Sequence, residues 1–124
     1  MKKMMTVVMA LVVVAGVGLA DTNKDYDLYL LNALKDDNIG IRTSAAELLG
    51  ERKVESAIDP LSKLVKNETN VSARIVYATA LFKIGDAKAY DVLKYIAQYD
   101  RNKTVRHIAM SLAREMENKK FARL

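Results

Sequence analysis

Residues 36–49 read DDNIGIRTSAAELL, and the same pattern returns twice, each time 32 residues further along. The second copy, ETNVSARIVYATAL, starts at Glu68, and the third, DRNKTVRHIAMSLA, starts at Asp100. Each copy has an acid, an Asn two positions later and an Arg six positions after the acid. A stripe of small and apolar residues at helical spacing follows. A fixed period of this length, without gaps, is typical of a stacked-repeat protein.

The N-terminus, residues 1–20, has the composition of a secretory signal peptide. Lys2 and Lys3 precede an apolar run over 6–17, and Gly18-Leu19-Ala20 offers small residues for cleavage. An uncleaved membrane anchor is the alternative, but the run is shorter than the roughly 20 residues that a spanning helix needs. We expect cleavage after Ala20, a mature domain of residues 21–124, and a bacterial protein in the periplasm or outside the cell.

The charge of the chain is mildly basic. Removal of Lys2 and Lys3 leaves 18 basic residues against 15 acidic ones, which lowers the formal charge from +5 to +3. The signs alternate along the chain, whereas a nucleic-acid-binding protein usually shows a clustered basic face; we therefore expect no nucleic-acid partner. Only residues 119–123, KKFAR, are a basic cluster, which suits a helix C-terminus or an anionic surface. Cysteine is absent and Gly and Pro are scarce, which favours an all-α domain.

Periodicity predicts six helices in three antiparallel pairs, the repeats spanning about 26–52, 55–84 and 87–118. The Asn in each copy of the motif is expected to cap a second helix. Pro60 is expected to bend the third helix, and Gly85 to end the fourth, after which Asp86 begins the fifth. The expected helices cover residues 26–35, 39–52, from about 56, 71–84, 87–99 and 103–118.

The motif, followed by AIDPLSKL at residues 57–64, resembles the short HEAT-like repeats of bilin-lyase-type proteins. Tetratricopeptide and ankyrin repeats fit less well, because their characteristic Trp/Leu/Gly/Tyr and Thr-Pro-Leu-His patterns are missing. The resemblance implies an armadillo-like α-solenoid of three helix pairs with a right-handed superhelix. It also implies a ladder of hydrogen bonds between neighbouring repeats, carried by Asp36, Arg42, Glu68, Arg74, Asp100 and Arg106.

The acid and Arg motif is interpreted as structural because a catalytic site would not recur at every repeat. His107 is the only histidine, and with no Cys beside it a zinc site is not expected. The run from Asp36 to Asn38 lacks the remaining positions of a calcium-binding loop. We therefore expect no catalysis, no cofactor and no metal site.

The surface of the second helices is then the candidate for function. Ile75 and Phe82 form an apolar pair among polar neighbours, which indicates a contact patch unless the stack itself covers it. Tyrosines on the first helices are expected to lie half-buried at the rims. The candidate partner-binding residues are Ile75, Thr79, Phe82, Lys83, His107 and Arg114.

These features favour an exported protein–protein interaction scaffold or adaptor. The alternative is an accessory or chaperone-like subunit of an enzyme complex, holding a ligand or substrate segment in the concave groove. The outer faces of helices 26–35 and 103–118 also allow a homodimer through an open end of the solenoid.

Overall fold

The fold is known from a computed structural model, which describes residues 23–122. Within this range the chain forms a helix over residues 23–33 and five further α-helices, with a short 3-10 helix, η1 (Glu55–Ala57), before α3. The remaining helices are α2 (Ile39–Glu51), α3 (Ile58–Asn67), α4 (Val71–Ile84), α5 (Ala87–Tyr99) and α6 (Lys103–Ala122). The predicted signal peptide lies outside the described residues.

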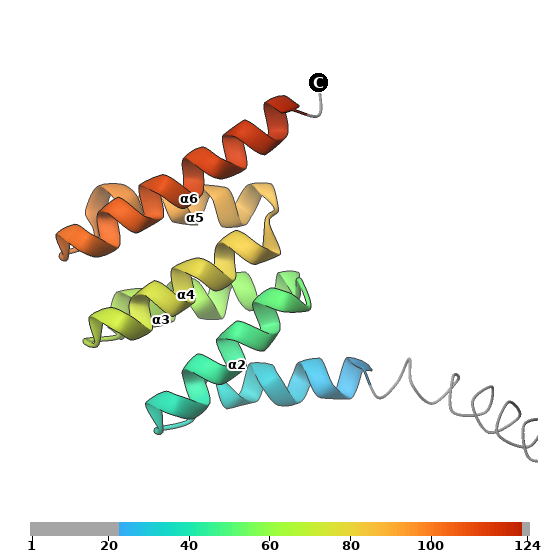
Figure 1. The fold of residues 1–124 in the computed structure, drawn as a ribbon. Helices are drawn as coiled ribbons and strands as arrows, with labels where there is room; N and C mark the ends of the chain where they lie inside the picture. Colours follow the sequence, from blue (N-terminus) through green and yellow to red (C-terminus); the bar gives the residue numbers. More distant parts are fainter. Residues whose placement is uncertain (1–22, 123–124) are drawn as a thin grey trace, which may run out of the picture.

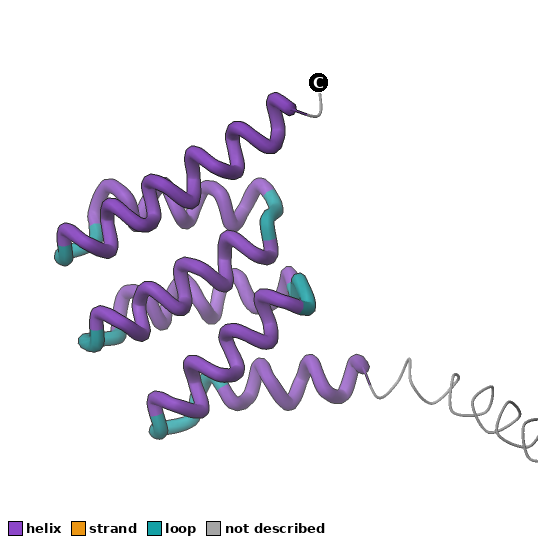
Figure 2. The backbone as a smooth tube through the Cα atoms, viewed as in Figure 1, coloured by secondary structure: helices purple, strands orange, loops and turns teal. Residues whose placement is uncertain are grey.

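The helices form three antiparallel pairs that stack side by side. Figure 1 shows α2, α4 and α6 in one layer, with the helix over 23–33, α3 and α5 behind them in a second layer. Figure 2 shows that short loops join all of these helices. The predicted all-α solenoid is therefore confirmed, and each pair consists of one helix from each layer.

Local capping determines where the second helices begin. The side chains of Asn38, Asn70 and Asn102 accept hydrogen bonds from backbone N–H groups three residues later, at 3.2, 2.9 and 3.1 Å. This is the expected N-cap geometry. Gly85 ends α4 in the left-handed conformation, with φ of 75°, and the Asp86 side chain caps Ala89 N–H at 2.8 Å. These boundaries agree with the sequence prediction.

Pro60 lies nearer the start of the third helix than expected. It occupies the third position of α3, within the first turn, where a backbone N–H has no intrahelical partner. The missing donor therefore costs the helix no hydrogen bond. The change of geometry lies earlier, where η1 passes into α3 at Ile58.

The central helix α4 contacts α2, α3, α5 and α6. Its apolar residues point in all directions, and Tyr77, Ala78 and Leu81 are inaccessible to solvent. A helix that is apolar all round needs cover on most sides, and the flanking pairs supply it. The core of the domain therefore lies around α4, as its sequence indicates.

Gly50 lies where α2 packs closely against α4. Gly50 is buried, and a Cβ atom added there would lie 2.9 Å from the Cα atom of Ala80. The absence of a side chain lets α2 and α4 approach closely at this point. Phe82 occupies the corresponding position of α4, 32 residues later.

Two other expectations need correction. Three tyrosines of the first helices are less buried than predicted, since Tyr29, Tyr95 and Tyr99 are 68, 50 and 61 % exposed, whereas Tyr90 is half-buried as expected. The last helix is also longer than predicted, because α6 continues beyond residue 118 to Ala122. Lys119 and Lys120 lie in its last turn, where positive charge complements the helix dipole.

Candidate functional site

A ladder of polar contacts ties the repeats together at the edge where the second helices begin. Its central member is Arg74, which is 2 % exposed. Its Nη1 donates to the backbone carbonyls of Glu68 and Thr69 at 3.0 and 3.1 Å, within its own repeat. Its Nη2 donates to Asp100 Oδ1 in the next repeat at 3.3 Å, and its Nε lies 3.3 Å from Asp100 Oδ2. One guanidinium thus joins two repeats.

Arg42 occupies the same position one repeat earlier and makes the same contacts. Its Nη1 donates to the carbonyls of Asp36 and Asp37, and its Nη2 donates to Glu68 Oε2 at 2.9 Å. Its Nε also donates to the Tyr77 hydroxyl at 3.4 Å. These hydrogen bonds, to Tyr77 and then to Glu68, raise the pKa of Arg42 above its ordinary value. The Arg42 guanidinium that links the two repeats therefore stays protonated.

The acids of the second and third motifs each have two partners. Glu68 and Asp100 accept the Arg of the preceding repeat, and each also accepts the backbone N–H of the Asn two residues later, at 3.2 and 2.9 Å. The Asn then caps its helix. The motif therefore couples helix initiation to the contact between repeats. The same few residues determine where a second helix begins and which arginine of the preceding repeat it binds.

Two ladder members were missed by sequence reasoning. Arg101 donates to the carbonyls of Lys66 and Glu68 in the preceding repeat, and Tyr77 accepts from Arg42. Both depart from the period, since Asp37 and Ala45 occupy the corresponding positions in the first copy. These departures from the period were the only sequence signal that Arg101 and Tyr77 have a special role, but they did not show which side chains contact each other.

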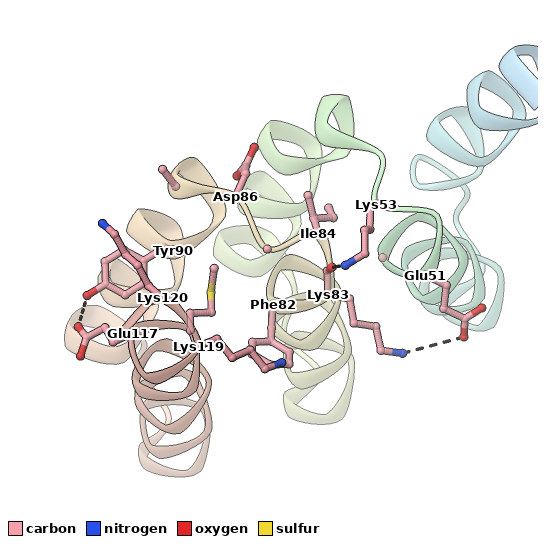
Figure 3. A pocket seen from close by; sticks show the side chains of 14 residues that line it. Glu51, Lys53, Phe82, Lys83, Ile84, Asp86, Tyr90, Glu117, Lys119 and Lys120 are labelled. Atoms are coloured by element: carbon pink, nitrogen blue, oxygen red, sulfur yellow. Dashed lines mark hydrogen bonds and ion pairs between the residues drawn. The ribbon is translucent and has the colours of Figure 1, made fainter. Parts of the chain in front are cut away.

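An open groove lies at the opposite edge, where the second helices end (Figure 3). Its volume is about 1210 Å³. It is bounded by the end of α2, by the turn between α4 and α5, and by the last turns of α6. The extension of α6 beyond the predicted boundary supplies part of one wall, including Lys119 and Lys120.

The groove combines apolar surface with charge. Phe82 and Met116 are half-buried and contribute apolar surface, while Lys119 Nζ lies 4.7 Å from the centroid of the Phe82 ring. Such an arrangement is a cation–π contact. Ile84 also lines the groove and is buried. The apolar part is therefore a ledge of side chains that pack on the core and still face the groove.

Four lysines and three acids line the groove. Lys53 Nζ donates to the carbonyl of Lys83 at 2.9 Å, and Lys83 Nζ lies 4.0 Å from Glu51, at the limit of an ion pair. Lys120 is exposed, and among residues 23–122 no acid pairs with it. Lys119 Nζ lies 3.6 Å from Glu115 Oε1, so Lys120 is the groove lysine most accessible to an anionic ligand.

The acids of the groove are more engaged than its lysines. The Asp86 carboxylate caps α5, and the Tyr90 hydroxyl donates to the Glu117 carboxylate. That hydrogen bond raises the pKa of Tyr90, because loss of the phenolic proton would place two negative charges together. Four lysines against three acids leave the groove with a small positive formal charge, and two of the acids are held by local hydrogen bonds.

The predicted partner-binding residues do not form one surface. Phe82 and Lys83 line the groove, whereas Ile75 packs, half-buried, against the core outside it. The Thr79 hydroxyl donates to the Ile75 carbonyl at 2.9 Å. His107 is exposed, and Arg114 lines a separate hollow between α5 and α6. Ile75 therefore does not line the groove with Phe82, and the contact patch expected from this pair stays a prediction.

Stacked antiparallel helix pairs, tied at one edge by a repeating ladder and hollowed at the other, define an α-solenoid. Residues 28–113 match the family described as HEAT repeats, and the chain belongs to this family. A comparison with curated proteins found no match.

Two further observations bear on the site. In the part of the chain that the structure describes, no three His, Cys, Asp or Glu residues come together in a way that would hold a metal ion. Over the same residues, none of the helices has both the length and the apolar character needed to cross a membrane.

Proposed function

We propose that this protein is a non-catalytic scaffold or adaptor that binds a segment of a partner protein in the groove at the ends of α2, α4 and α6. The observation that carries the proposal is the groove itself, which has an apolar ledge at Phe82 and Met116 inside a border of lysines. HEAT repeats commonly mediate protein–protein interaction, which supports a binding role.

The composition of the groove suggests the chemistry of the segment. An apolar anchor would pack on Phe82 and Met116, and carboxylates on either side would approach Lys83 and Lys120. Charge at the border of a binding site contributes mainly to association rate and orientation, whereas the buried apolar centre contributes most of the affinity. We therefore infer an acidic segment with one or two large apolar side chains.

The same proposal includes export. The N-terminal Lys pair, the apolar run and the small residues before Asp21 support a cleaved signal and a place in the periplasm or outside the cell. Fractionation of cells that express the full chain, with mass spectrometry of its N-terminus, tests this part. A chain that keeps Met1 and stays in the cytoplasm would contradict it.

Site-specific crosslinking tests the binding role. A photoreactive side chain in place of Lys120 should crosslink a discrete protein partner in the native cell. The same probe in place of Lys63, which is exposed on α3, serves as the matched control and should not. Equal crosslinking at both positions would show that the groove has no special role.

Charge reversal then tests the groove with the identified partner. The double variant Lys83→Glu and Lys120→Glu should weaken binding on the order of tenfold or more, with the largest effect at low salt. The control double variant Lys35→Glu and Lys63→Glu changes the net charge equally, at exposed positions away from the groove. Binding that falls equally in both pairs would indicate a nonspecific effect of net charge.

A further inference from the structure

The ladder between repeats is incomplete at both ends of the stack. Arg106 donates Nη1 to the Asp100 carbonyl at 2.6 Å, as the other ladder arginines do within their repeats. Within residues 23–122, however, no carboxylate lies within ion-pair distance of Arg106, whereas Arg42 and Arg74 each pair with the acid of the next repeat. The C-terminal end of the stack therefore presents an arginine whose carboxylate partner is missing.

The N-terminal end presents the complementary group. Asp36 accepts the backbone N–H of Asn38 at 2.8 Å, as the later acids do. It is exposed, and in the described part of the chain no arginine reaches its side chain. Asp100, at the corresponding position inside the stack, has a side chain only 3 % exposed and pairs with Arg74.

The apolar faces beside these groups are also uncovered. Ile41 and Leu48 are 45 and 36 % exposed on α2, while Ala73 and Ala80, 32 residues later on α4, are both only 2 % exposed. Inside the stack, the preceding pair covers these positions. At the N-terminal end of the stack, two larger apolar side chains occupy them without cover.

The other end shows the matching half of that interface. Met110 on α6 is 41 % exposed, while Ala78, at the same position of α4, is inaccessible. Met110, Ala113 and Arg114 line a hollow of about 390 Å³ between α5 and α6, at the place where a further helix pair would pack. The two ends of the stack are therefore the two halves of one interface, which the chain already uses twice between its own repeats.

We propose that a second copy of this chain stacks head to tail on the first, with α6 of one copy against α2 of the next. Arg106 then binds Asp36 of the next copy and completes the ladder, and Ile41 and Leu48 cover Met110 and the hollow beside it. Continuity with the interface between repeats and the opposite charges at the two ends support this arrangement. Because the joined faces differ, the contact leaves an open end on each side and allows longer chains.

This inference does not depend on the groove proposed above. The groove opens at the edge of the stack, whereas the joint uses its two end faces. Loss of partner binding in the groove can therefore be distinguished from loss of self-association. The protein would present several grooves along one assembly, each formed by a separate copy.

Sedimentation velocity of the purified chain tests the proposal, with its N-terminus read by mass spectrometry. The mean mass should rise with protein concentration. Leu48→Glu blocks the N-terminal face and Met110→Glu blocks the C-terminal face, so each variant alone should stay monomeric. Mixed in equal amounts, they should form a one-to-one dimer, because each supplies the face that the other lacks. Both side chains are exposed, so thermal melting should be unchanged.

A charge exchange tests the ladder contact itself. Arg106→Asp or Asp36→Arg alone should weaken self-association about tenfold or more, because each places like charges together. A chain that carries both substitutions should recover association, since the pair is restored in reversed order. A wild-type chain that stays monomeric at every concentration, a mixture that forms no dimer, or association lost in only one single variant would each overturn the head-to-tail joint.

Discussion

Replacement of Arg74 by alanine tests the ladder most directly. The guanidinium donates to two carbonyls and pairs with Asp100, and both side chains are almost fully buried. The variant would leave the Asp100 carboxylate buried with only the Asn102 N–H as partner, and would leave two carbonyls without their donor. Removal of one member of a buried ion pair typically costs about 3–5 kcal/mol. We expect Arg74→Ala to lower the free energy of unfolding by this amount.

The size of the domain determines how far this loss of free energy lowers the melting temperature. A domain of about 100 residues has a total stability of roughly 5–15 kcal/mol, and each kcal/mol lowers its Tm by about 4–8 °C. Arg74→Ala should therefore melt tens of degrees below the wild type or fail to fold. Urea unfolding followed by circular dichroism measures the difference where the variant folds.

Arg106→Ala is the matched control. It removes the same side chain from the same repeat position, but only one carbonyl contact and no carboxylate pair are lost. We expect a loss of about 0.5–1.5 kcal/mol, measured at low protein concentration so that self-association does not contribute. Equal losses for Arg74→Ala and Arg106→Ala would refute the idea that the contact between repeats, and not the local bond, stabilises the stack.

Further substitutions test packing, backbone and groove. Gly50→Ala should destabilise by about 1–3 kcal/mol in thermal melts despite better helix propensity, because its Cβ would meet Ala80 at 2.9 Å; an unchanged melt would mean that α2 can move away. Gly85→Ala should cost about 1 kcal/mol in the same assay, because φ is 75° there; a stabilised variant would contradict the left-handed cap. Glu117→Gln should lower the pKa of Tyr90 toward the ordinary 10.0, seen by NMR titration of its ring. In the wild type, the Tyr90–Glu117 hydrogen bond should be present near pH 10 and be lost as the pH rises through the raised pKa of Tyr90. An identical Tyr90 titration in the wild type and in Glu117→Gln would exclude the hydrogen bond.

Sequence alone predicted the features that depend on neighbouring residues. The Asn caps, the left-handed Gly85 and the limits of α4 and α5 follow from short-range chemistry, so they could be read from the chain. The end of α6 could not, because its last turns contain charged residues but no Gly or Pro to stop the helix. The exposure of Tyr29 could not be read either, because it depends on whether another helix packs on that face, and among residues 23–122 none covers it.

The groove was beyond sequence reasoning for a different reason. It exists because three chain segments far apart in sequence end at one edge, and because α6 extends past its predicted boundary. Phe82 was a candidate because it broke the period, and it does line the groove. Ile75 broke the period in the same way, yet it packs outside the groove. A departure from periodicity indicates that a residue differs in role from its counterparts in the other repeats, but it does not show which surface the side chain lines.

The different residues at Gly50 and Phe82 bear on the curvature of the whole solenoid. Gly50 and Phe82 occupy the same position of the repeat. Gly50 has no side chain where α2 meets α4, whereas Phe82 places a phenyl ring in the groove beside α6. Side-chain volume at this position therefore limits how closely successive second helices can approach at the groove edge. Smaller residues there would flatten or close the groove, and larger ones would widen it, while the ladder at the far edge stays in place. A single site per repeat would thus adjust the width available to a ligand.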